Sequence, residues 1–267
     1  MNETTPPMDQ LRDPKEKTAW LCLAAASVPV WLLIVIWVVA SVGIPLIFIG
    51  LLWLAKHFGE YFAAAFIRTN GVRLAEEQLP ELHALARQAA LKLGVELPEV
   101  YVLQHNVWNA FAVKLAGKRL VVLYSGAIDS LLLKGDLRQL AWLIGHELGH
   151  HAAGHLDAGK RWVVLGGWLP WLYLWYSRRC EFTCDRVGLY CAGSLDISNA
   201  ALANLAVGSQ LADKVNLAEA IRQWEGHSKE FFVRYRTLYS THPQLLCRLA
   251  ELRTAAASLG IPEEAGG

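Results

Sequence analysis

The chain has 267 residues, of which 54% are hydrophobic and only 18% are charged. This composition excludes an intrinsically disordered chain, because such chains are poor in apolar residues and rich in net charge. The formal net charge of +1 argues against nucleic acid as a partner, because no overall positive field would hold a polyanion. Five cysteines are too few, and odd in number, for a disulfide scaffold, and they fit a reducing compartment.

The first part of the chain divides into a polar tail and a long uncharged run. Residues 1–18 contain three prolines and charges of both signs, and we expect a short polar tail there. From Ala19 to Ala55, 37 residues contain no Asp, Glu, Lys, Arg or His. A single straight helix of that length would measure roughly 55 Å, against a hydrocarbon core of about 30 Å. Two passes fit better, from about Trp20 to Val39 and from Ile44 toward Phe58, because a glycine and a proline interrupt the run between them.

The uncharged run has two alternative interpretations and an expected orientation. A cleaved signal peptide has a much shorter apolar core and a small-residue cleavage site, which argues against it here, and one tilted helix is the second alternative. Basic residues flank both ends of the run, at Arg12, Lys15, Lys17, Lys56, Arg68 and Arg73. Because the expected turn has none, the positive-inside rule places both ends of a transmembrane helical hairpin in the cytoplasm, together with the rest of the chain.

A second apolar segment, residues 162–176, contains no charge and is rich in Trp and Tyr. It is too short to span a membrane comfortably. Lys160 and Arg161 precede it, and Arg178 and Arg179 follow it. Aromatic residues between cations are typical of an anchor at the lipid headgroups or of a shallow re-entrant piece. A hairpin buried in the protein core is the alternative.

The remainder predicts a mainly helical domain with a small sheet. Alternation and turn signals predict three short strands, at residues 99–103, 110–115 and 119–124. Apolar periodicity and helix boundaries predict six helices, at residues 76–93, 136–155, 182–192, 197–212, 216–225 and 243–258. A sheet packed on helices gives an α+β fold. We therefore expect the tail, a membrane hairpin with a membrane-proximal helix over 19–67, and one domain over 68–267.

Residues 146–150 read HELGH, an example of the HExxH pattern. On a helix, His146 and His150 lie about 40° apart around the axis, so both imidazoles face one point and can share a zinc ion. Glu147 lies about 100° from His146, where it can take a proton from a water molecule without being a ligand. Chance gives the pattern in roughly 2 of 100 chains of this composition, and its place inside a predicted helix favours the metal site.

A catalytic zinc site needs a third protein ligand. The pattern HExxHxxGxxH does not supply it, because Gly154 and His155 are each displaced by one residue from that pattern. If the helix continues, His155 lies about 140° beyond His150 and cannot reach the same metal. We expect His155 to cap the helix or to stand behind the metal ligands.

A glutamate from a second helix is the other candidate for the third ligand. Glu181 and Asp185 lie four residues apart and share a face of a predicted helix. Glu181 can bind the zinc ion while Asp185 accepts an N–H from a zinc-bound histidine, which orients that ligand and raises its basicity. An ordinary helix face, with salt bridges to Arg178 or Arg186, is the alternative.

Over roughly residues 68–253 the chain resembles the HtpX-like membrane zinc metallopeptidases, the group that includes the CaaX prenyl endopeptidase of the endoplasmic reticulum. The motifs that carry the resemblance stand in the family's order, at Gly71–Arg73, Pro80–His83, Pro98–Val102, Asn109–Ala112, His146–His150, Gly154–His155, Glu181–Asp185 and Thr241–Pro243. Together they are far more specific than HExxH alone. The chain departs from the family in its short interval between His150 and Glu181, where HtpX has further spanning helices, and at Cys184, where an alanine is usual. We expect Cys180, Cys184 and Cys191 to serve as small packing residues, and a redox-sensitive or metal-damaging cluster is the alternative.

The resemblance implies a gluzincin-type site with one Zn²⁺ per chain, in a zincin-type metallopeptidase domain. The metal would be held by His146, His150 and Glu181, with Glu147 as the base. The resemblance also implies a substrate-binding edge strand that pairs with a peptide backbone, at Asn109, Ala110, Phe111 and Ala112.

His242 would lie near the metal, where it would stabilise an oxyanion or occupy the fourth zinc position in a latent state. A His-Pro pair before a helix is also an ordinary helix boundary.

These implications predict a membrane-anchored zinc endopeptidase that hydrolyses membrane or membrane-proximal protein substrates, in protein quality control. We expect it in the lipid bilayer of the cell inner membrane, with the catalytic domain facing the cytoplasm. A latent, chaperone-like or binding module with a closed zinc site is the first alternative. A structural membrane protein with an accidental HExxH is the second.

Overall fold

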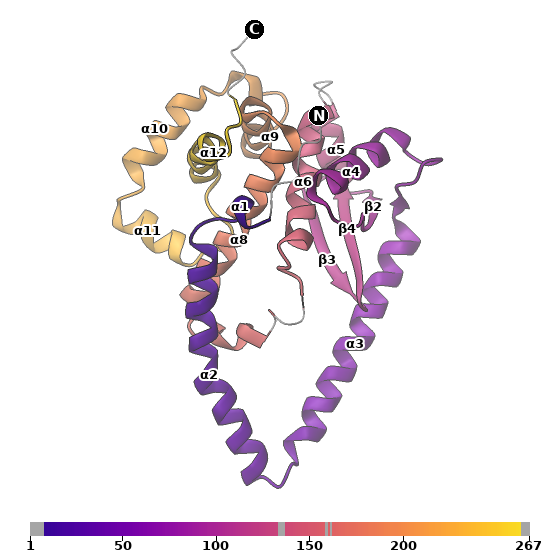
Figure 1. Ribbon diagram of the computed structural model, residues 1–267, viewed down its shortest axis with the longest axis vertical. Coiled ribbons are helices and arrows are strands. Elements are labelled where there is room, and N and C mark those ends of the chain that lie inside the picture. The colour runs from indigo at the N-terminus through magenta and orange to yellow at the C-terminus, as the bar shows by residue number, and fades with distance from the viewer. Residues whose placement is uncertain (1–7, 133–136, 158–159, 161, 263–267) are drawn as a thin grey trace.

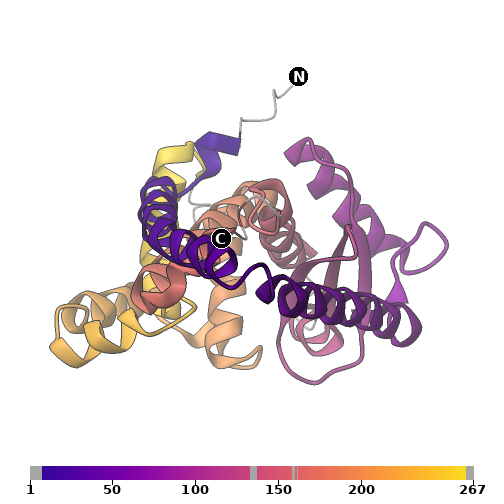
Figure 2. The same ribbon diagram turned by 90° about the horizontal axis from the view of Figure 1, so that it is seen from below.

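A computed structural model describes residues 8–132, 137–157, 160 and 162–262. Two long helices, α2 (Glu16–Ala40) and α3 (Pro45–Asn70), form a V whose apex is the turn at residues 41–44 (Figure 1). The turn is tight because Val42 and Gly43 both have positive φ, and Pro45 then starts α3 in a position that needs no hydrogen-bond donor. Seen from below, α2 runs toward the helical half of the molecule and α3 runs along the sheet (Figure 2).

The two arms of the V are the apolar helices that the uncharged run predicts. Among the described residues, α2 and α3 are the two helices long and apolar enough to cross a membrane. α3 continues to Asn70, beyond the predicted end near Phe58, and its last turns cover the sheet. Most of the large apolar side chains along both arms are exposed, so the protein itself leaves these surfaces without cover.

A mixed four-stranded sheet is made of β1 (Val72–Arg73), β2 (Glu99–Leu103), β3 (Ala110–Leu115) and β4 (Lys118–Tyr124). Their order is β1-β2-β4-β3, with β2 and β4 parallel and the other pairs antiparallel, so β3 lies at an edge. Strand β4 is buried on both faces, as a continuous apolar run predicts. One face packs against Ile67 of α3, and the other joins the main core. The predicted strands are confirmed to within one residue.

The other helices pack on one face of the sheet and continue away from it into a helical half of the molecule (Figure 1). They are α1 (Met8–Leu11), α4 (Pro80–Leu93), α5 (Ser125–Leu132), α6 (Leu137–Ala152), α8 (Pro170–Ala192), α9 (Leu195–Val207), α10 (Leu217–His227), α11 (Phe231–Leu238) and α12 (Leu245–Leu259). Two short 3₁₀ helices are η1 (Trp162–Trp168) and η2 (Ala212–Lys214). The expected α+β class therefore holds at the level of a mainly helical protein with a small mixed sheet.

Four predicted helix boundaries are wrong by three residues or more. Helix α4 begins at Pro80 rather than at residue 76, because residues 72–73 form β1 and a bridged turn follows it. Helix α6 ends at Ala152 rather than at residue 155, in a turn where Gly154 has positive φ. Its expected start signal at residues 135–136 lies outside the described residues. Helix α8 begins at Pro170, twelve positions before the predicted start, because a proline fits the first position of a helix. Helix α9 ends at Val207 rather than at residue 212, because Gly208 follows it with positive φ.

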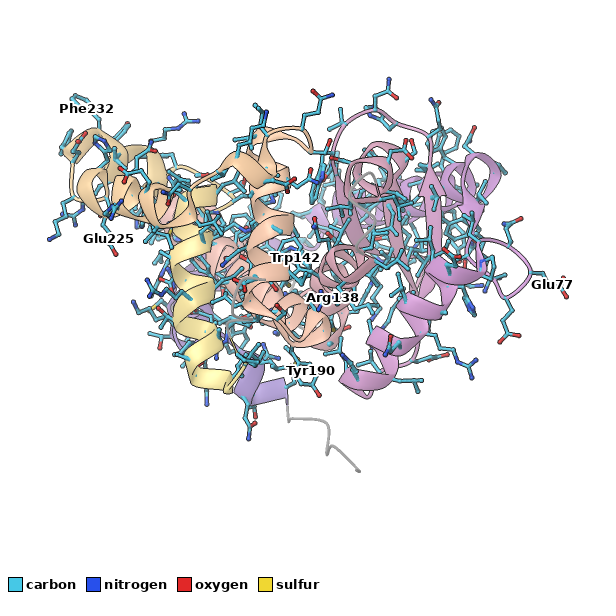
Figure 3. All side chains as sticks on the ribbon, turned by 90° about the horizontal axis from the view of Figure 1, so that it is seen from above. Glu77, Arg138, Trp142, Tyr190, Glu225 and Phe232 are labelled. Atoms are coloured by element: carbon cyan, nitrogen blue, oxygen red, sulfur yellow. The ribbon has the colours of Figure 1, made fainter. Side chains whose placement is uncertain are left out.

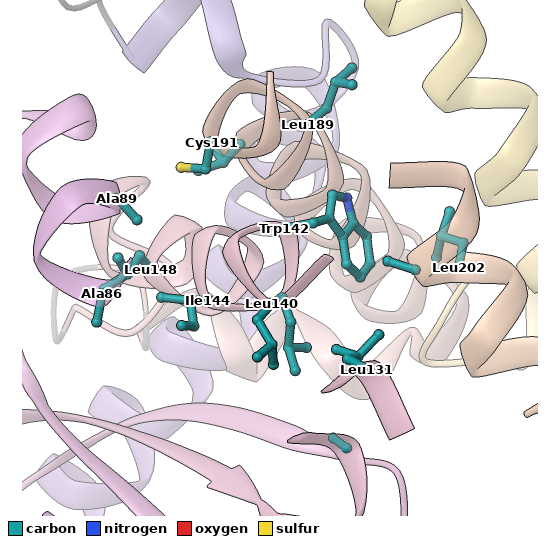
Figure 4. Packing of buried hydrophobic residues seen from close by; sticks show 14 of the residues in the cluster. Ala86, Ala89, Leu131, Leu140, Trp142, Ile144, Leu148, Leu189, Cys191 and Leu202 are labelled. Atoms are coloured by element: carbon teal, nitrogen blue, oxygen red, sulfur yellow. The ribbon is translucent and has the colours of Figure 1, made fainter. Parts of the chain in front are cut away.

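Helix α6 is the centre of the main core (Figure 4). Its Ile144 and Leu148 face Ala86 and Ala89 of α4. The indole of Trp142 lies beside Leu202 of α9 and near the middle of the molecule (Figures 3 and 4). Because α6 packs against α4, α8, α9 and the sheet, the functional side chains that it carries are held by a rigid element.

Helices α6 and α8 approach each other very closely because their contact consists of small residues. A Cβ added at Gly145 would lie 2.7 Å from the Cβ of Cys191, and one added at Gly149 would lie 3.2 Å from the Cα of Cys184. A Cβ at Gly188 would lie 2.8 Å from the carbonyl oxygen of Trp142. Cysteines 184 and 191 are buried in this contact, as expected for small packing residues.

The Trp-rich segment 162–176 consists of η1 and the start of α8. It packs along α2: the Trp162 and Trp31 rings lie 4.8 Å apart, and Trp168 Nε1 donates to the carbonyl of Ala26 over 2.9 Å. Gly166 allows this approach, because a Cβ there would lie 2.2 Å from the carbonyl oxygen of Leu23. The segment is thus attached to an apolar helix rather than buried as a hairpin in the main core. Its flanking Arg161 lies outside the described residues.

The described part of the predicted polar tail packs against the domain. Residues 1–7 lie outside the described residues. Leu11, Asp13 and Glu16 are buried. Thr183 of α8 accepts the backbone N–H of Asp13 over 2.9 Å. Residues 8–16, called the segment before α2 although Glu16 is the first residue of that helix, therefore pack against the domain.

Candidate metal centre

Helix α6 places His146, Glu147 and His150 along one cleft of about 420 Å³. Glu181 of α8, the edge strand β3 and the loop before α12 complete its walls. The close contact between α6 and α8 brings the histidines of one helix within reach of the carboxylate of the other. The residues that HExxH and Glu181 predict for one site are thus brought together.

Each candidate histidine approaches one oxygen of the Glu181 carboxylate. His146 Nε2 lies 3.6 Å from Glu181 Oε2, and His150 Nε2 lies 3.7 Å from Glu181 Oε1. Two ligand atoms bound to one tetrahedral zinc ion are roughly 3.4 Å apart, given bonds of about 2.1 Å. The observed spacing and the set of two imidazoles and one carboxylate therefore fit a zinc ion.

Cys184 is a competing third donor. Its sulfur and the ring nitrogens of His146 and His150 lie within 4.8 Å of one another. Cys184 is fully buried and does not line the cleft, whereas Glu181 does. Burial also raises the pKa of the Cys184 thiol well above its usual range, which opposes the thiolate that a metal requires. Glu181 is the better third donor.

The charges of the site favour a cation. Burial lowers the pKa of His146, but hydrogen bonds to Asp185 and Glu181 outweigh it and raise the value to about 10. Burial lowers the pKa of His150 to about 3, so this imidazole is neutral. Burial opposes ionisation of Glu181, yet the contact with His146 lowers its pKa. A proton on His146 thus neutralises part of the negative charge that a divalent ion would balance.

Asp185 stands behind His146, as predicted. Its Oδ1 lies 3.0 Å from His146 Nδ1, the ring nitrogen that faces away from Glu181. Arg248 of α12 donates through Nε to Asp185 Oδ2 over 2.8 Å and through Nη2 to Oδ1 over 2.5 Å. Burial opposes the charge of Asp185, but Arg248 lowers its pKa, so the carboxylate is ionised. The sequence did not reveal Arg248, because nothing in its local pattern distinguishes it from a surface arginine.

His155 stands behind His150. The turn that ends α6 folds His155 back, so that its Nδ1 lies 3.2 Å from His150 Nδ1. This contact is impossible in a continued helix, and the early end of α6 therefore decides the place of His155.

Glu147 faces the cleft from a buried position. Burial raises the pKa of Glu147 to about 7, although the nearby His146 acts in the opposite direction. The backbone N–H of Ala112 contacts its carboxylate. A carboxylate of this kind is suited to taking and returning a proton near neutral pH.

The predicted substrate-binding residues Asn109, Ala110, Phe111 and Ala112 all line the cleft. Strand β3 begins at Ala110, while the carbonyl of Asn109 still accepts the backbone N–H of Tyr124 over 3.1 Å. Trp108, which the sequence did not single out, also lines the cleft.

His242 lies in the loop before α12, which forms another wall of the cleft. Its Nε2 is 3.9 Å from Glu181 Oε1, and its side chain is 69% exposed. The preceding loop is fixed to α8, because Ser177 donates to the carbonyl of Thr241 over 3.0 Å and Arg178 donates to that of Ser240 over 2.6 Å. The structure thus brings His242 to the edge of the ligand group.

Comparison with known proteins gives one family. The model of Peptidase family M48 matches residues 76–161 and 160–256. The chain is 28% identical to plastoglobule-localized metallopeptidase 48 of Arabidopsis thaliana, over 71% of this chain and 61% of that protein. It is 28% identical to a protease HtpX homolog of Thermoplasma acidophilum, over 48% of this chain and 38% of that protein. It is 24% identical to protease HtpX homolog 2 of Methanosarcina acetivorans, over 78% of this chain and 83% of that protein. No solved structure matches the chain significantly.

Proposed function

The chain belongs to Peptidase family M48, and we propose that it is a zinc-dependent endopeptidase anchored in a membrane. The observation that carries the proposal is the convergence of His146, His150 and Glu181 in one cleft, beside a buried Glu147 and a strand edge. The match covers only 61% of the length of the first relative named above and 38% of the length of the second. The proposed activity, substrates and membrane position therefore rest on this chain's own residues.

His146, His150 and Glu181 would hold the metal. When bound, a zinc ion supplies a Lewis acid and a water molecule of lowered pKa. Glu147 takes the proton from the attacking water and returns it to the leaving amine, for which its raised pKa is suited. Asp185 keeps His146 in the tautomer that presents Nε2 to the cleft.

The edge of β3 would hold the substrate. One edge of β3 pairs with β4, and its other edge has no strand partner among the described residues. Ala110, Phe111 and Ala112 of this strand line the cleft. An extended peptide that adds to this edge would run past Glu147, because the backbone of Ala112 already contacts the Glu147 carboxylate. The proposed substrates are therefore segments in an extended conformation.

Replacement of Glu147 tests the peptidase proposal. We expect the full chain in detergent and its Glu147→Gln variant to bind one zinc ion each, while hydrolysis of an unfolded test protein falls roughly a hundredfold to ten-thousandfold in the variant. Glu77→Gln, on the surface, is the matched control and should leave hydrolysis unchanged (Figure 3). Equal hydrolysis by the Glu147→Gln variant would contradict the proposal.

His242 distinguishes an active site from a latent one. Its high exposure favours a role toward substrate, as a donor that stabilises the oxyanion. In that role, His242→Ala lowers hydrolysis roughly a hundredfold, with zinc content unchanged. The latent, chaperone-like alternative requires His242 to close the metal site, and a rise in hydrolysis in the same variant would support it.

The membrane proposal rests on the exposed apolar surfaces of α2 and α3. We propose that residues 19–67 form the membrane hairpin, that residues 68–267 form the peptidase domain, and that segment 162–176 enters the bilayer beside α2. Trp162 reaches the level of Trp31, which lies roughly 20 Å along α2 from its first residue. Substrates that are membrane proteins or lie close to the membrane follow from this placement.

Labelling of single cysteines tests the orientation. In a chain carrying Cys22→Ala and Cys247→Ala, whose remaining native cysteines are buried, Val42→Cys at the turn should react with a membrane-impermeant maleimide in intact cells. Glu77→Cys, in the domain, should react only after the membrane is opened. This pattern is expected if the domain faces the cytoplasm of the cell inner membrane, and the reverse pattern would contradict that orientation.

A further inference from the structure

The segment before α2 reaches the candidate metal centre through two side chains. His150 presents Nε2 to Glu181, and its other ring nitrogen, Nδ1, lies 3.2 Å from Nδ1 of His155. On its far side, His155 Nε2 lies 3.3 Å from Oε1 of Glu16, the first residue of α2. A buried row of polar groups thus joins the cleft to the start of the first apolar helix.

The proton positions along this row follow from one requirement. A histidine that binds a metal through Nε2 carries its proton on Nδ1. The Nδ1–H of His150 then donates to His155 Nδ1, which must be unprotonated to accept it. His155 consequently carries its own proton on Nε2, which lies 3.3 Å from the carboxylate of Glu16 in an ion-pair contact rather than an aligned hydrogen bond. A carboxylate at Glu16 therefore favours the tautomers that both histidines need.

Glu16 is held as a charged group despite being 3% exposed. It contacts Arg12 in an ion pair, accepts the hydroxyl of Thr183 over 2.5 Å, and lies 3.8 Å from Lys160 Nζ. A buried carboxylate needs such partners, because an unpaired buried charge is costly.

We infer that Glu16 and His155 are positioning residues for His150, and that the metal centre is complete only when the segment before α2 is docked. This inference rests on the proposed function, because it assumes that His150 binds the metal. It differs from the support of His146, in which a carboxylate contacts the ligand directly.

Docking of the segment is also secured by contacts that do not involve the Glu16 carboxylate. Arg12 Nη2 donates to the carbonyl of Ala153 in the turn after α6 over 2.7 Å. Arg186 of α8 donates through Nε to the carbonyl of Leu11 over 3.0 Å. The segment therefore touches both the turn that carries His155 and the helix that carries Glu181.

A second metal site is the main alternative use of this cluster, since Glu16, His155 and Cys180 hold three donor atoms within 4.8 Å of one another. Two cations, Arg12 and Lys160, already contact the Glu16 carboxylate and would repel a metal ion. Burial also raises the pKa of Cys180 above its usual range, so the thiolate is disfavoured. The positioning role fits the charges better.

Zinc affinity tests the inference without using hydrolysis. The full chain in detergent is titrated with zinc against a competing chelator, and its cobalt-substituted form is followed by the visible absorption of the metal. We expect Glu16→Gln to weaken zinc binding roughly tenfold or more and to change the cobalt spectrum, because removal of such an outer partner of a ligating histidine typically costs ten- to a hundredfold in affinity.

Asp13→Asn is the matched control. It removes another buried carboxylate of the same segment, one that contacts Arg179 rather than His155. It should leave zinc affinity and the cobalt spectrum unchanged, even where both variants lower thermal stability alike. An equal loss of affinity in both variants would overturn the positioning role of Glu16 and His155 and leave a general effect of docking or folding.

His155→Ala provides a second route if Glu16→Gln does not fold. It should weaken zinc binding at least as much, and Glu16→Gln added to it should have no further effect on affinity. Unchanged affinity in either single variant, while the parent chain binds zinc, would overturn the positioning role alone. A parent chain that binds no zinc would overturn the proposed function as well, so the two failures are distinguishable.

Discussion

The two histidines of the HExxH motif are supported in different ways. His146 is backed by a buried carboxylate, Asp185, which a buried arginine, Arg248, holds through two hydrogen bonds. His150 contacts a second histidine, His155. The carboxylate, that of Glu16 on the segment before α2, contacts His155 and not His150 itself. The first support belongs to the packed helices of the core. The second depends on a turn and on a segment distant in sequence, so one half of the site is intrinsic to the domain and the other half is conditional.

The largest expected effect comes from the support of His146. Asp185→Asn removes the only negative charge that contacts Arg248 among the described ion pairs. The free energy of unfolding should fall by roughly 3–5 kcal/mol, because the arginine remains buried without a counter-charge. Thermal unfolding in detergent measures the change, with Glu225→Gln on the surface as the control (Figure 3). An unfolding temperature equal to that of the control would show that this support is not structural.

A smaller effect is expected from a substitution that separates α6 from α8, the helix that carries Glu181. Gly145→Ala would place a Cβ 2.7 Å from the Cβ of Cys191, so α6 and α8 must separate. We expect a loss of roughly 1–3 kcal/mol in the free energy of unfolding, together with weaker zinc binding.

Gly226→Ala, in α10, is the matched control for this substitution. No atom lies within 4 Å of the added Cβ, and the replacement should stabilise the protein by up to about 1 kcal/mol through helix propensity. If both alanines stabilised the protein, the close approach of α6 and α8 would not be required.

The smallest effect on zinc affinity is expected from replacing Cys184, whose thiol lies near both motif histidines. The sulfur of Cys184 lies 3.8 Å from His155 Nδ1 and close to both motif histidines. Because we assign the third ligand to Glu181, Cys184→Ala should change zinc affinity by no more than about twofold, whereas Glu181→Gln should weaken it ten- to a hundredfold or more. Zinc content after dialysis distinguishes the two, and loss of metal in Cys184→Ala would reassign the ligand.

The difference between the supports also explains what the sequence could predict. Alternation and turn signals predict β2, β3 and β4 to within a residue, and HExxH and ExxxD predict side chains that converge in the structure. These are local patterns, in which spacing along one element fixes direction in space. Asp185 could be placed behind a histidine for the same reason.

The other half of the site depends on features that local patterns do not encode. His155 reaches His150 only because α6 stops at Ala152, and helix ends are poorly defined by periodicity. Glu16 lies at the start of an apolar helix and Arg248 inside a C-terminal one, so each resembles an ordinary surface charge in sequence. Helices α5 and α11 were missed because each is only eight residues long.

The docking of Glu16 on α8 also has a consequence for the order of events during synthesis. Glu16 and its hydroxyl partner Thr183 are separated by 167 residues. At a rate of about 5–20 residues per second, roughly 10–30 s pass between the appearance of the first and that of the second. Until then Glu16 lacks its partner on α8, and His150 itself is made only toward the end of that interval. The proposed metal centre therefore comes together only after most of the chain has been made.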